Sequence, residues 1–336
     1  MKANQLQQRV PELSVDLSVE GKQHGFLTLP QRSTDSRHGS MQVPVCVVRR
    51  DEGPTIALLA GARGDEYEGQ IALQHLANTL QVDDVSGCVI IVPTMNKAAS
   101  DVGQALTPSD QRDLGQSFPG NVAGSVTEQL AFAITTLILE HVDRVIEFQS
   151  GGNSTQYASL AAVHFNTDNR ALQTTCEESM IAFGADYSAR LLPASSDTLA
   201  YAIQEQNKPY IAVRLGGGGS CHASGVESAL VGMKNVLVQL QMLNHDLVLR
   251  ATRMLEVTSG KNYVYAPNEG LLQMCKEPGE EVYLGSPIAK IVNPSDTGSL
   301  PVVIKADRNG ILMARHHNGR IAHGNCLAIV ADEVQR

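Results

Sequence analysis

The sequence predicts an α/β protein with a mainly parallel sheet, helices on both faces and a small β module at the C-terminus. Nearly continuous apolar runs at 55–62 and 89–93 are typical of central strands that are covered on both faces, and a third strand is predicted at 144–148. Strand and helix patterns alternate along the chain, which favours a parallel sheet. Beyond about residue 255 the helical periodicity disappears and glycines recur at regular spacings, which indicates an all-β unit.

The other elements follow in order along the chain. Residues 15–30 and 41–50 alternate apolar and polar side chains, which predicts edge strands. Ser125 and Glu128 have the spacing of a capping box, in which each side chain satisfies a free backbone N–H where a helix begins. The polar segment 96–124 predicts a functional loop, because loops of this length inside a compact domain are usually functional. Helices are predicted at 67–80, 125–141, 169–184, 196–207 and 226–243, and further strands at 157–166, 187–193 and 209–215.

The C-terminal segment contains an internal duplication. GLLQMCKEPGEEVYLGSPIAKIV at 270–292 aligns with GILMARHHNGRIAHGNCLAIVA at 310–331. This pattern resembles the barrel-sandwich module of biotinyl and lipoyl domains. Because no lysine stands at the expected hairpin tip, we favour a structural or oligomerisation module over a carrier of a prosthetic group. We therefore divide the chain into an α/β domain at 1–254, which includes the N-terminal edge strands, and an all-β domain at 255–336.

Composition argues against several classes of function. The chain has 336 residues and a formal net charge of −9, and an acidic surface repels the phosphate backbone of nucleic acids. No apolar run has the length of a signal peptide or a membrane span, and the six cysteines are scattered without a CxxC pair. These features predict a cytoplasmic protein with reduced thiols that binds neither nucleic acid nor a membrane. A homo-oligomer is compatible with the sequence, which does not determine the oligomeric state.

Glycines surround two carboxylates at the end of the first central strand. Gly61, Gly64 and Gly69 flank Asp65 and Glu66. In open α/β sheets ligands bind at the carboxyl ends of the strands, so a carboxylate at this place can serve as a metal ligand. It can equally be a helix N-terminal charge that the helix dipole stabilises. This stretch alone leaves both interpretations open.

Further segments occur in one order along the chain. They are GARGDEYEGQIAL at 61–73, VPTMNKAA at 92–99, SFPG at 117–120, GSVTEQLA at 124–131, VIEFQSGG at 145–152 and RLGGGG at 214–219. From about residue 40 to the C-terminus the chain resembles the zinc-carboxypeptidase-like succinylglutamate desuccinylase/aspartoacylase family. The nearest likeness is to its N-acetyl-diaminobutyrate deacetylase branch. The resemblance implies hydrolysis of an amide bond by zinc, held by a His-x-x-Glu turn and a second histidine, with a glutamate as general base.

The chain departs from the family at most of the positions that the resemblance assigns to this chemistry. The first histidine falls at Arg63 and the second at Gln149. The general base falls at Arg214, and Gln116 stands where the family has a substrate-binding arginine. Arginine has no lone pair to give to zinc, and a neutral amide oxygen is a poor ligand beside imidazole. We therefore predict an empty zinc site, with Glu66 as the only remaining ligand, and no cofactor.

The replacements change the charge of the predicted pocket. Without a metal ion, Glu66 and Glu147 are buried carboxylates that need a partner. We predict that Arg63 or Arg214 fills the space of the zinc ion and pairs with Glu66, since a guanidinium engages a carboxylate through two hydrogen bonds. The alternative is that both arginines point into solvent. An open cationic pocket can bind a small anion such as an acyl amino acid, with the backbone amides of 216–219 as further donors.

Two histidines remain as candidates for the pocket. His164 ends an apolar strand, where it is either a pocket ligand or, as we favour, a hydrogen-bonded strand-end residue. Cys221 and His222 suggest a thiol nucleophile with its base, but adjacent residues of an extended chain point to opposite sides. We therefore do not expect this pair to react.

Three functions are compatible with these residues. The one we favour is a catalytically degraded, pseudoenzyme-like family member that binds a small acidic or acylated amino-acid-like molecule or a protein partner. The second is an active zinc-dependent amide hydrolase, a deacylase of N-acyl amino acids, with ligands from other positions. The third is a metal-free hydrolase with a new nucleophile, which is disfavoured because no Ser-His-Asp or Cys-His arrangement stands at convincing positions.

Overall fold

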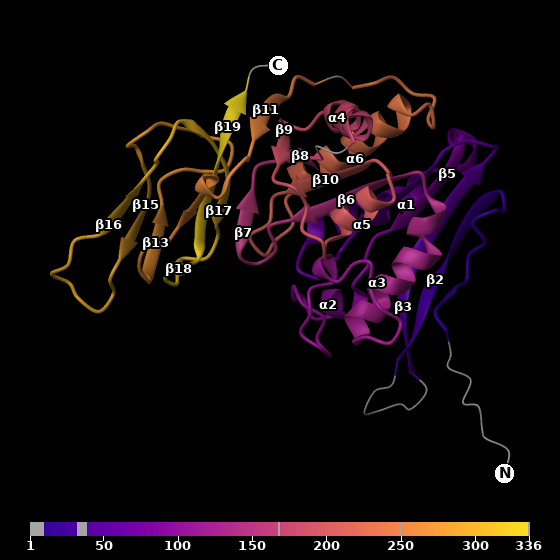
Figure 1. The fold of residues 1–336 in the computed structure, drawn as a ribbon, viewed down its shortest axis with the longest axis horizontal. Helices are drawn as coiled ribbons and strands as arrows, with labels where there is room; N and C mark the ends of the chain where they lie inside the picture. Colours follow the sequence, from indigo (N-terminus) through magenta and orange to yellow (C-terminus); the bar gives the residue numbers. More distant parts are fainter. Residues whose placement is uncertain (1–9, 32–38, 167–168, 249, 335–336) are drawn as a thin grey trace, which may run out of the picture.

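The chain folds into an α/β part with a β module at its C-terminal end (Figure 1). The computed structural model describes residues 10–31, 39–166, 169–248 and 250–334. The helices are α1 Tyr67–Thr79, α2 Lys97–Asp101, α3 Val126–Leu137, α4 Arg170–Phe183, α5 Leu199–Glu205 and α6 Ala223–Gln239. The strands of the α/β part are β1 Glu12–Leu13, β2 Gly21–Gln31, β3 Gly39–Arg50, β4 Thr55–Ala60, β5 Gly87–Val92, β6 Arg144–Ser150, β7 Thr155–Tyr157, β8 Leu160–His164, β9 Tyr187–Leu191, β10 Tyr210–Leu215 and β11 Arg253–Glu256. Those of the module are β12 Tyr263–Tyr265, β13 Gly270–Met274, β14 Glu281–Val282, β15 Pro287–Val292, β16 Val302–Lys305, β17 Gly310–His316, β18 Arg320–Ile321 and β19 Cys326–Val334.

One large sheet runs through most of the molecule. Its path is β1-β2-β3-β5-β4-β6-β10-β8-β9-β11-β19-β17-β14, with β12 and β7 paired beside it. Strands β5, β4, β6 and β10 are parallel. Strand β8 is antiparallel to β10 and begins a second parallel set with β9 and β11. The predicted α/β class with a mainly parallel sheet is therefore confirmed.

Helices cover both faces of the parallel strands. On one face α1, α4 and α6 share a core with the sheet, and on the other face α3 and α5 do so. The side chains of β4 alternate between these cores, with Ile56 and Leu58 in the first and Ala57 and Leu59 in the second. This double burial explains the continuous apolar run of the strand. No helix in the described part of the chain combines the length and the hydropathy that crossing a bilayer requires.

Some predicted elements have different bounds. The capping box is present, since the Ser125 N–H donates to Glu128 Oε2 over 2.8 Å and the Glu128 N–H donates to Ser125 Oγ over 3.4 Å. The helix α3 ends before the predicted residue, because the chain tightens into a 3₁₀ turn at Leu139–His141. The predicted strand 157–166 is divided into β7 and β8, because β7 leaves the main path of the sheet and pairs with β17.

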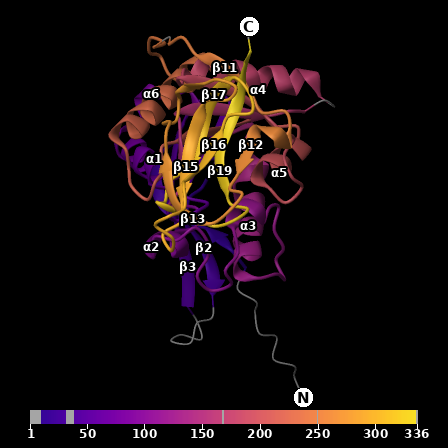
Figure 2. The same cartoon turned by 90° about the vertical axis from the view of Figure 1, so that its left-hand side faces the viewer.

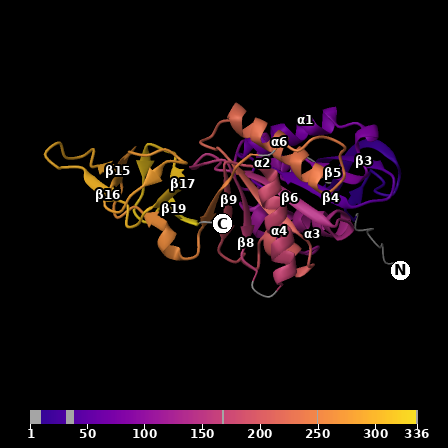
Figure 3. The same cartoon turned by 90° about the horizontal axis from the view of Figure 1, so that it is seen from above.

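The C-terminal module contains a separate antiparallel sheet. Strands β16, β15, β13 and β18 form it, and they share a core with β17 and β19 of the large sheet. Figure 2 looks from the side of this module onto the α/β part, and Figure 3 shows β15 and β16 at one end of the long axis. The large sheet crosses residue 254, since β11 pairs with both β9 and β19. The division of the chain into two domains at this point remains a prediction.

Gly69 allows α1 to lie close against β6. A Cβ at this position would lie 2.5 Å from Cβ of Phe148, closer than real Cβ atoms approach. We predict that Gly69→Ala lowers the free energy of unfolding by about 1–3 kcal/mol, because the helix must move away from the sheet. Urea denaturation measures this change. The control is Gly260→Ala, where an added Cβ meets no atom within 4 Å, and equal stability of the two variants would contradict the prediction.

Candidate functional site

A cavity of about 230 Å³ lies where β4, β6 and β10 end, on the face of the sheet that α5 covers. The residues that we predicted for the pocket all line it: Arg63, Glu66, Gln116, Glu147, Gln149, His164 and Arg214. Gln116 reaches it from a 3₁₀ turn at Leu114–Gln116, inside the long loop that precedes α3. The roles of these residues in binding or catalysis remain predictions.

The pairing of β6 with β10 arranges the centre of the site. Gln149 lies beside Arg214, and Glu147 lies beside Ala212. Side chains two residues apart on a strand project on the same face. Glu147, Gln149, Tyr210 and Arg214 therefore all project toward the cavity, which each of them lines.

The loop between β4 and α1 carries Arg63 and Glu66. Gly61 begins this loop with a φ of 68°, a left-handed conformation that glycine adopts without strain. Gly64 lies against the backbone of Ala99, where an added Cβ would come within 2.1 Å of the carbonyl carbon. Close backbone contacts thus fix the position of both charged residues.

Arg63 pairs with Asp113. Its Nε and Nη2 donate to Asp113 Oδ2 over 3.0 and 2.5 Å, and Asp113 Oδ1 accepts the Gly115 N–H over 2.9 Å. Burial acts to lower the pKa of the guanidinium, but the Asp113 carboxylate outweighs it, and the pKa of Arg63 is raised. The predicted ion pair between Glu66 and an arginine is wrong, since within the described residues no salt bridge joins Glu66 to Arg63 or Arg214.

Two carboxyl groups are buried in the cavity. Glu66 is 6% exposed, and burial raises the pKa of its carboxyl to about 8 against the opposing effect of Arg63. Glu147 is 2% exposed, and burial raises its pKa as well. Glu147 Oε2 accepts hydrogen bonds from the Tyr210 hydroxyl and, over 2.9 Å, from Gln149 Nε2. Both carboxyl groups therefore hold their protons to higher pH than exposed carboxyl groups do.

Arg214 carries the second guanidinium of the cavity. Its central carbon lies 5.2 Å from the centroid of the Tyr157 ring, within cation–π distance. Tyr157 belongs to β7, which lies opposite Ala314 of β17. The C-terminal module thereby supports one wall of the cavity. Among the described residues, no salt bridge joins Arg214 to a carboxylate, so its charge is available to a ligand.

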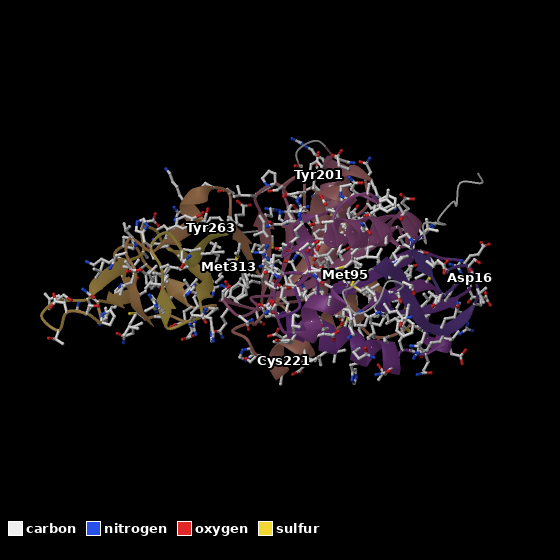
Figure 4. All side chains as sticks on the ribbon, turned by 90° about the horizontal axis from the view of Figure 1, so that it is seen from below. Asp16, Met95, Tyr201, Cys221, Tyr263 and Met313 are labelled. Carbon is white, nitrogen blue, oxygen red and sulfur yellow. The ribbon has the colours of Figure 1, made fainter. Side chains whose placement is uncertain are left out.

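His164 lines the cavity, whereas Cys221 and His222 lie outside it. The Nδ1 atom of His164 lies 2.7 Å from the carbonyl oxygen of Leu192, so Nδ1 carries the proton and Nε2 remains an acceptor. Burial lowers the pKa of this imidazole and favours its neutral form. His222 lines a second cavity of about 390 Å³, and its Nε2 lies 3.2 Å from the carbonyl oxygen of Gly217. Cys221 is exposed (Figure 4).

Sequence reasoning did not assign Asp113, Tyr157 or Tyr210 to the site, although all three line the cavity. Asp113 is separated from Arg63 by 50 positions in the chain, and no local pattern joins the two. Tyr210 could have been found, because it stands four positions before Arg214 on a predicted strand and must share its face.

The donors of the cavity do not fit a zinc ion, which needs at least three ligands with free lone pairs. Within the described ranges, no group of three His, Cys, Asp or Glu side chains could hold a metal. The carboxylates of Asp113 and Glu147 are engaged by their own hydrogen-bond donors. Glu66 and His164 remain as possible ligands, which is one fewer than the three that zinc needs.

Comparisons with known proteins relate the chain to a group of hydrolases. A family profile described as the succinylglutamate desuccinylase/aspartoacylase catalytic domain matches residues 52–240. The N-alpha-acetyl-L-2,4-diaminobutyric acid deacetylase of Halomonas elongata is 36% identical over 98% of this chain and 97% of that protein. The product-bound structure of the ectoine utilization protein EutE (DoeB) from Ruegeria pomeroyi is 36% identical, covers 97% of this chain and 99% of that chain, and has a TM-score of 0.93. The crystal structure of a succinylglutamate desuccinylase from Silicibacter sp. TM1040 is 34% identical to this chain and has a TM-score of 0.92. The match covers 99% of this chain and 100% of that chain.

These comparisons overturn the prediction of a catalytically degraded, pseudoenzyme-like protein. Identity of 36% over almost the whole length of a named deacetylase supports the alternative, an active amide hydrolase. The prediction was wrong because it inferred a loss of catalysis from the replacement of the zinc ligands alone. The cavity is nevertheless open, and it keeps the buried carboxyl groups of Glu66 and Glu147 beside the guanidinium groups of Arg63 and Arg214.

Because burial raises the pKa of Glu147, stability depends on pH. The unfolded chain releases this proton near the ordinary value of 4.5, whereas the fold keeps it to higher pH, so stability falls as pH rises above 4.5. The slope is at most about 1.4 kcal/mol per pH unit. We predict that Glu147→Gln removes this share of the slope in urea denaturation measured at increasing pH above 4.5. The exposed Glu52→Gln controls for net charge, and a slope unchanged by Glu147→Gln would contradict the prediction.

Proposed function

The chain belongs to the succinylglutamate desuccinylase/aspartoacylase family, and on this premise we propose that it hydrolyses the amide bond of a small N-acylated amino acid. The observation that carries the proposal is the identity to a named deacetylase along almost the whole chain. The high structural similarity to a product-bound relative supports it.

The cavity suits a small amide that carries a negative charge. Its volume of about 230 Å³ lies below the roughly 300–1,000 Å³ of sites for drug-sized ligands. Arg63 and Arg214 both line it, and burial favours the uncharged forms of Glu66 and Glu147. We assign the substrate carboxylate to Arg214, because a guanidinium binds a carboxylate through two parallel hydrogen bonds. Arg63 then faces the acyl group.

The reaction needs one water molecule. The water oxygen forms a bond to the acyl carbon, the C–N bond breaks, and a water proton ends on the leaving nitrogen, which gives a carboxylic acid and an amine. A group in the cavity has to carry that proton. The carboxyl groups of Glu66 and Glu147 line the cavity and supply this function. The neutral His164, with Nε2 as acceptor, is placed to orient the water or the amine.

The remaining features of the proposal rest on composition. We propose a small acylated amino acid as the ligand in place of nucleic acid, given the net charge of −9. The cytoplasm as its compartment and a homo-oligomeric state remain proposals of the same kind.

The function is tested with a panel of N-acyl amino acids. We expect the purified protein to release acetate from N-α-acetyl-L-2,4-diaminobutyrate or from another N-acetyl amino acid, or succinate from an N-succinyl amino acid, as detected by proton NMR. The matched control is the same amide with its carboxylate converted to a neutral carboxamide, which we expect to react more slowly, because it lacks the partner of Arg214. No release from any member of the panel, with or without added zinc, would refute the proposed function.

The role of Arg214 is tested by its replacement. Hydrogen bonds between charged groups contribute about 1.5–3 kcal/mol, so we predict that Arg214→Ala lowers kcat/KM about 10–100-fold, mainly through KM. Steady-state kinetics with the charged substrate and the neutral carboxamide measures this loss. The control is Arg112→Ala, which removes an arginine that pairs with Glu128 outside the cavity. Equal losses for the charged and the neutral substrate would show that Arg214 does not bind the carboxylate.

A further inference from the structure

The donor set of the cavity conflicts with the metal that the family implies. We propose that the guanidinium of Arg63, held by Asp113, takes the place of the metal cation and polarises the acyl carbonyl, so that the site works without a resident metal. This inference rests on the proposed amide hydrolysis and adds the identity of the group that stabilises the developing negative charge.

The position of Arg63 supports the inference. It stands in the turn after β4, where the resemblance places a zinc-binding histidine, and it lines the cavity together with Glu66. Two of its N–H groups, on Nε and Nη2, bind Asp113 Oδ2. A guanidinium has five N–H groups, so three remain for a ligand. The side chain of Arg63 is 44% exposed and that of Asp113 is 12% exposed, so the arginine is accessible while its partner is largely covered.

The anchoring of Asp113 makes this cation a fixed one. Asp113 Oδ1 accepts the Gly115 N–H, and the Ser117 hydroxyl donates to the Asp113 carbonyl oxygen over 2.8 Å. Arg63 itself follows Gly61 and precedes Gly64, whose close contact with Ala99 leaves no room for a side chain. Donors that are fixed before the reaction stabilise a developing oxyanion most effectively, because they need no reorganisation.

The surroundings of Arg63 disfavour a metal ion at the same place. A dication there would stand beside a guanidinium that stays charged at any physiological pH. Gln149 offers no compensation, because its Nε2 donates to Glu147 Oε2 over 2.9 Å. The guanidinium of Arg63 thus already supplies the positive charge that zinc supplies in the family. Its free N–H groups can bind the substrate oxygen that would otherwise bind to the open coordination position of the metal.

The first experiment measures metal binding without reference to activity. Wild-type protein, dialysed against a chelator, is titrated with zinc chloride in a calorimeter, and the zinc content of the purified protein is determined by elemental mass spectrometry. We expect no stoichiometric zinc in either measurement. The double variant Arg63→His, Gln149→His adds two imidazoles beside Glu66, and we expect it to bind one zinc ion per chain. One tightly bound zinc per chain in the wild type would overturn the inference, whether or not the protein hydrolyses amides.

The second experiment separates the role of Arg63 from a structural one. We expect hydrolysis by the wild type to be unaffected by the chelator, and Arg63→Ala to lower kcat about 10²–10³-fold with little change in KM. Arg63→Lys, which keeps the charge but loses the planar donors, should recover only part of the rate. Arg112→Ala, which removes an arginine of the neighbouring Asp113 loop that pairs with Glu128, is the control and should keep the wild-type rate. A rate that the chelator abolishes and zinc restores would overturn the inference and leave the proposed function intact.

The role of Arg63 can also be tested if the proposed amide hydrolysis is not found. If no amide is hydrolysed with or without zinc, the proposed function fails, and binding of N-α-acetyl-L-2,4-diaminobutyrate by calorimetry then tests Arg63 alone. Loss of binding in Arg63→Ala, but not in Arg112→Ala, supports Arg63 as the group that holds the acyl carbonyl. Equal affinity of both variants and the wild type overturns this assignment.

Discussion

The ion pair between Arg63 and Asp113 determines the electrostatics of the whole cavity. Asp113 accepts two hydrogen bonds from the guanidinium and is thereby its direct ion-pair partner. Glu66 lies close enough to be stabilised by Arg63, yet burial still raises its pKa to about 8. Desolvation thus outweighs the attraction of a cation that is already paired.

The fold brings these charges together from distant parts of the chain. The strands β4, β6 and β10 end at one edge, where open α/β sheets place their ligands. The register of β6 with β10 puts Gln149 beside Arg214. The C-terminal module contributes through β17, which pairs with β7 and so fixes Tyr157 under the guanidinium of Arg214. The module is therefore part of the architecture of the site, which a separate carrier domain would not be.

Much of this arrangement could be predicted from the sequence, and the failures have a common cause. Apolar runs and the capping box at Ser125 predict elements because they are local, and the Gly61–Gly69 stretch pointed to the turn that carries Arg63. The partner of Arg63 was predicted wrongly, because Asp113 becomes its neighbour only through the path of a long loop. The division of 157–166 into two strands was missed for the same reason, since it depends on pairing with β17. The prediction of lost activity was wrong for a different reason, because it considered a bound zinc ion as the only possible source of positive charge in the site.

Zinc and a guanidinium differ in what they can do for an amide. Both place positive charge at the carbonyl oxygen, but only the metal also lowers the pKa of a bound water molecule to about 7. A site that uses Arg63 has to remove a proton from water by another route. A carboxyl group with a raised pKa can act as the base only in its ionised form, in which it accepts a proton more strongly than an exposed carboxylate does. Glu66 and Glu147 are both buried in the cavity, and burial raises the pKa of each. On the proposal that Arg63 takes the place of the metal, Glu66 still has a function, because a carboxyl group without a metal to bind can carry a proton.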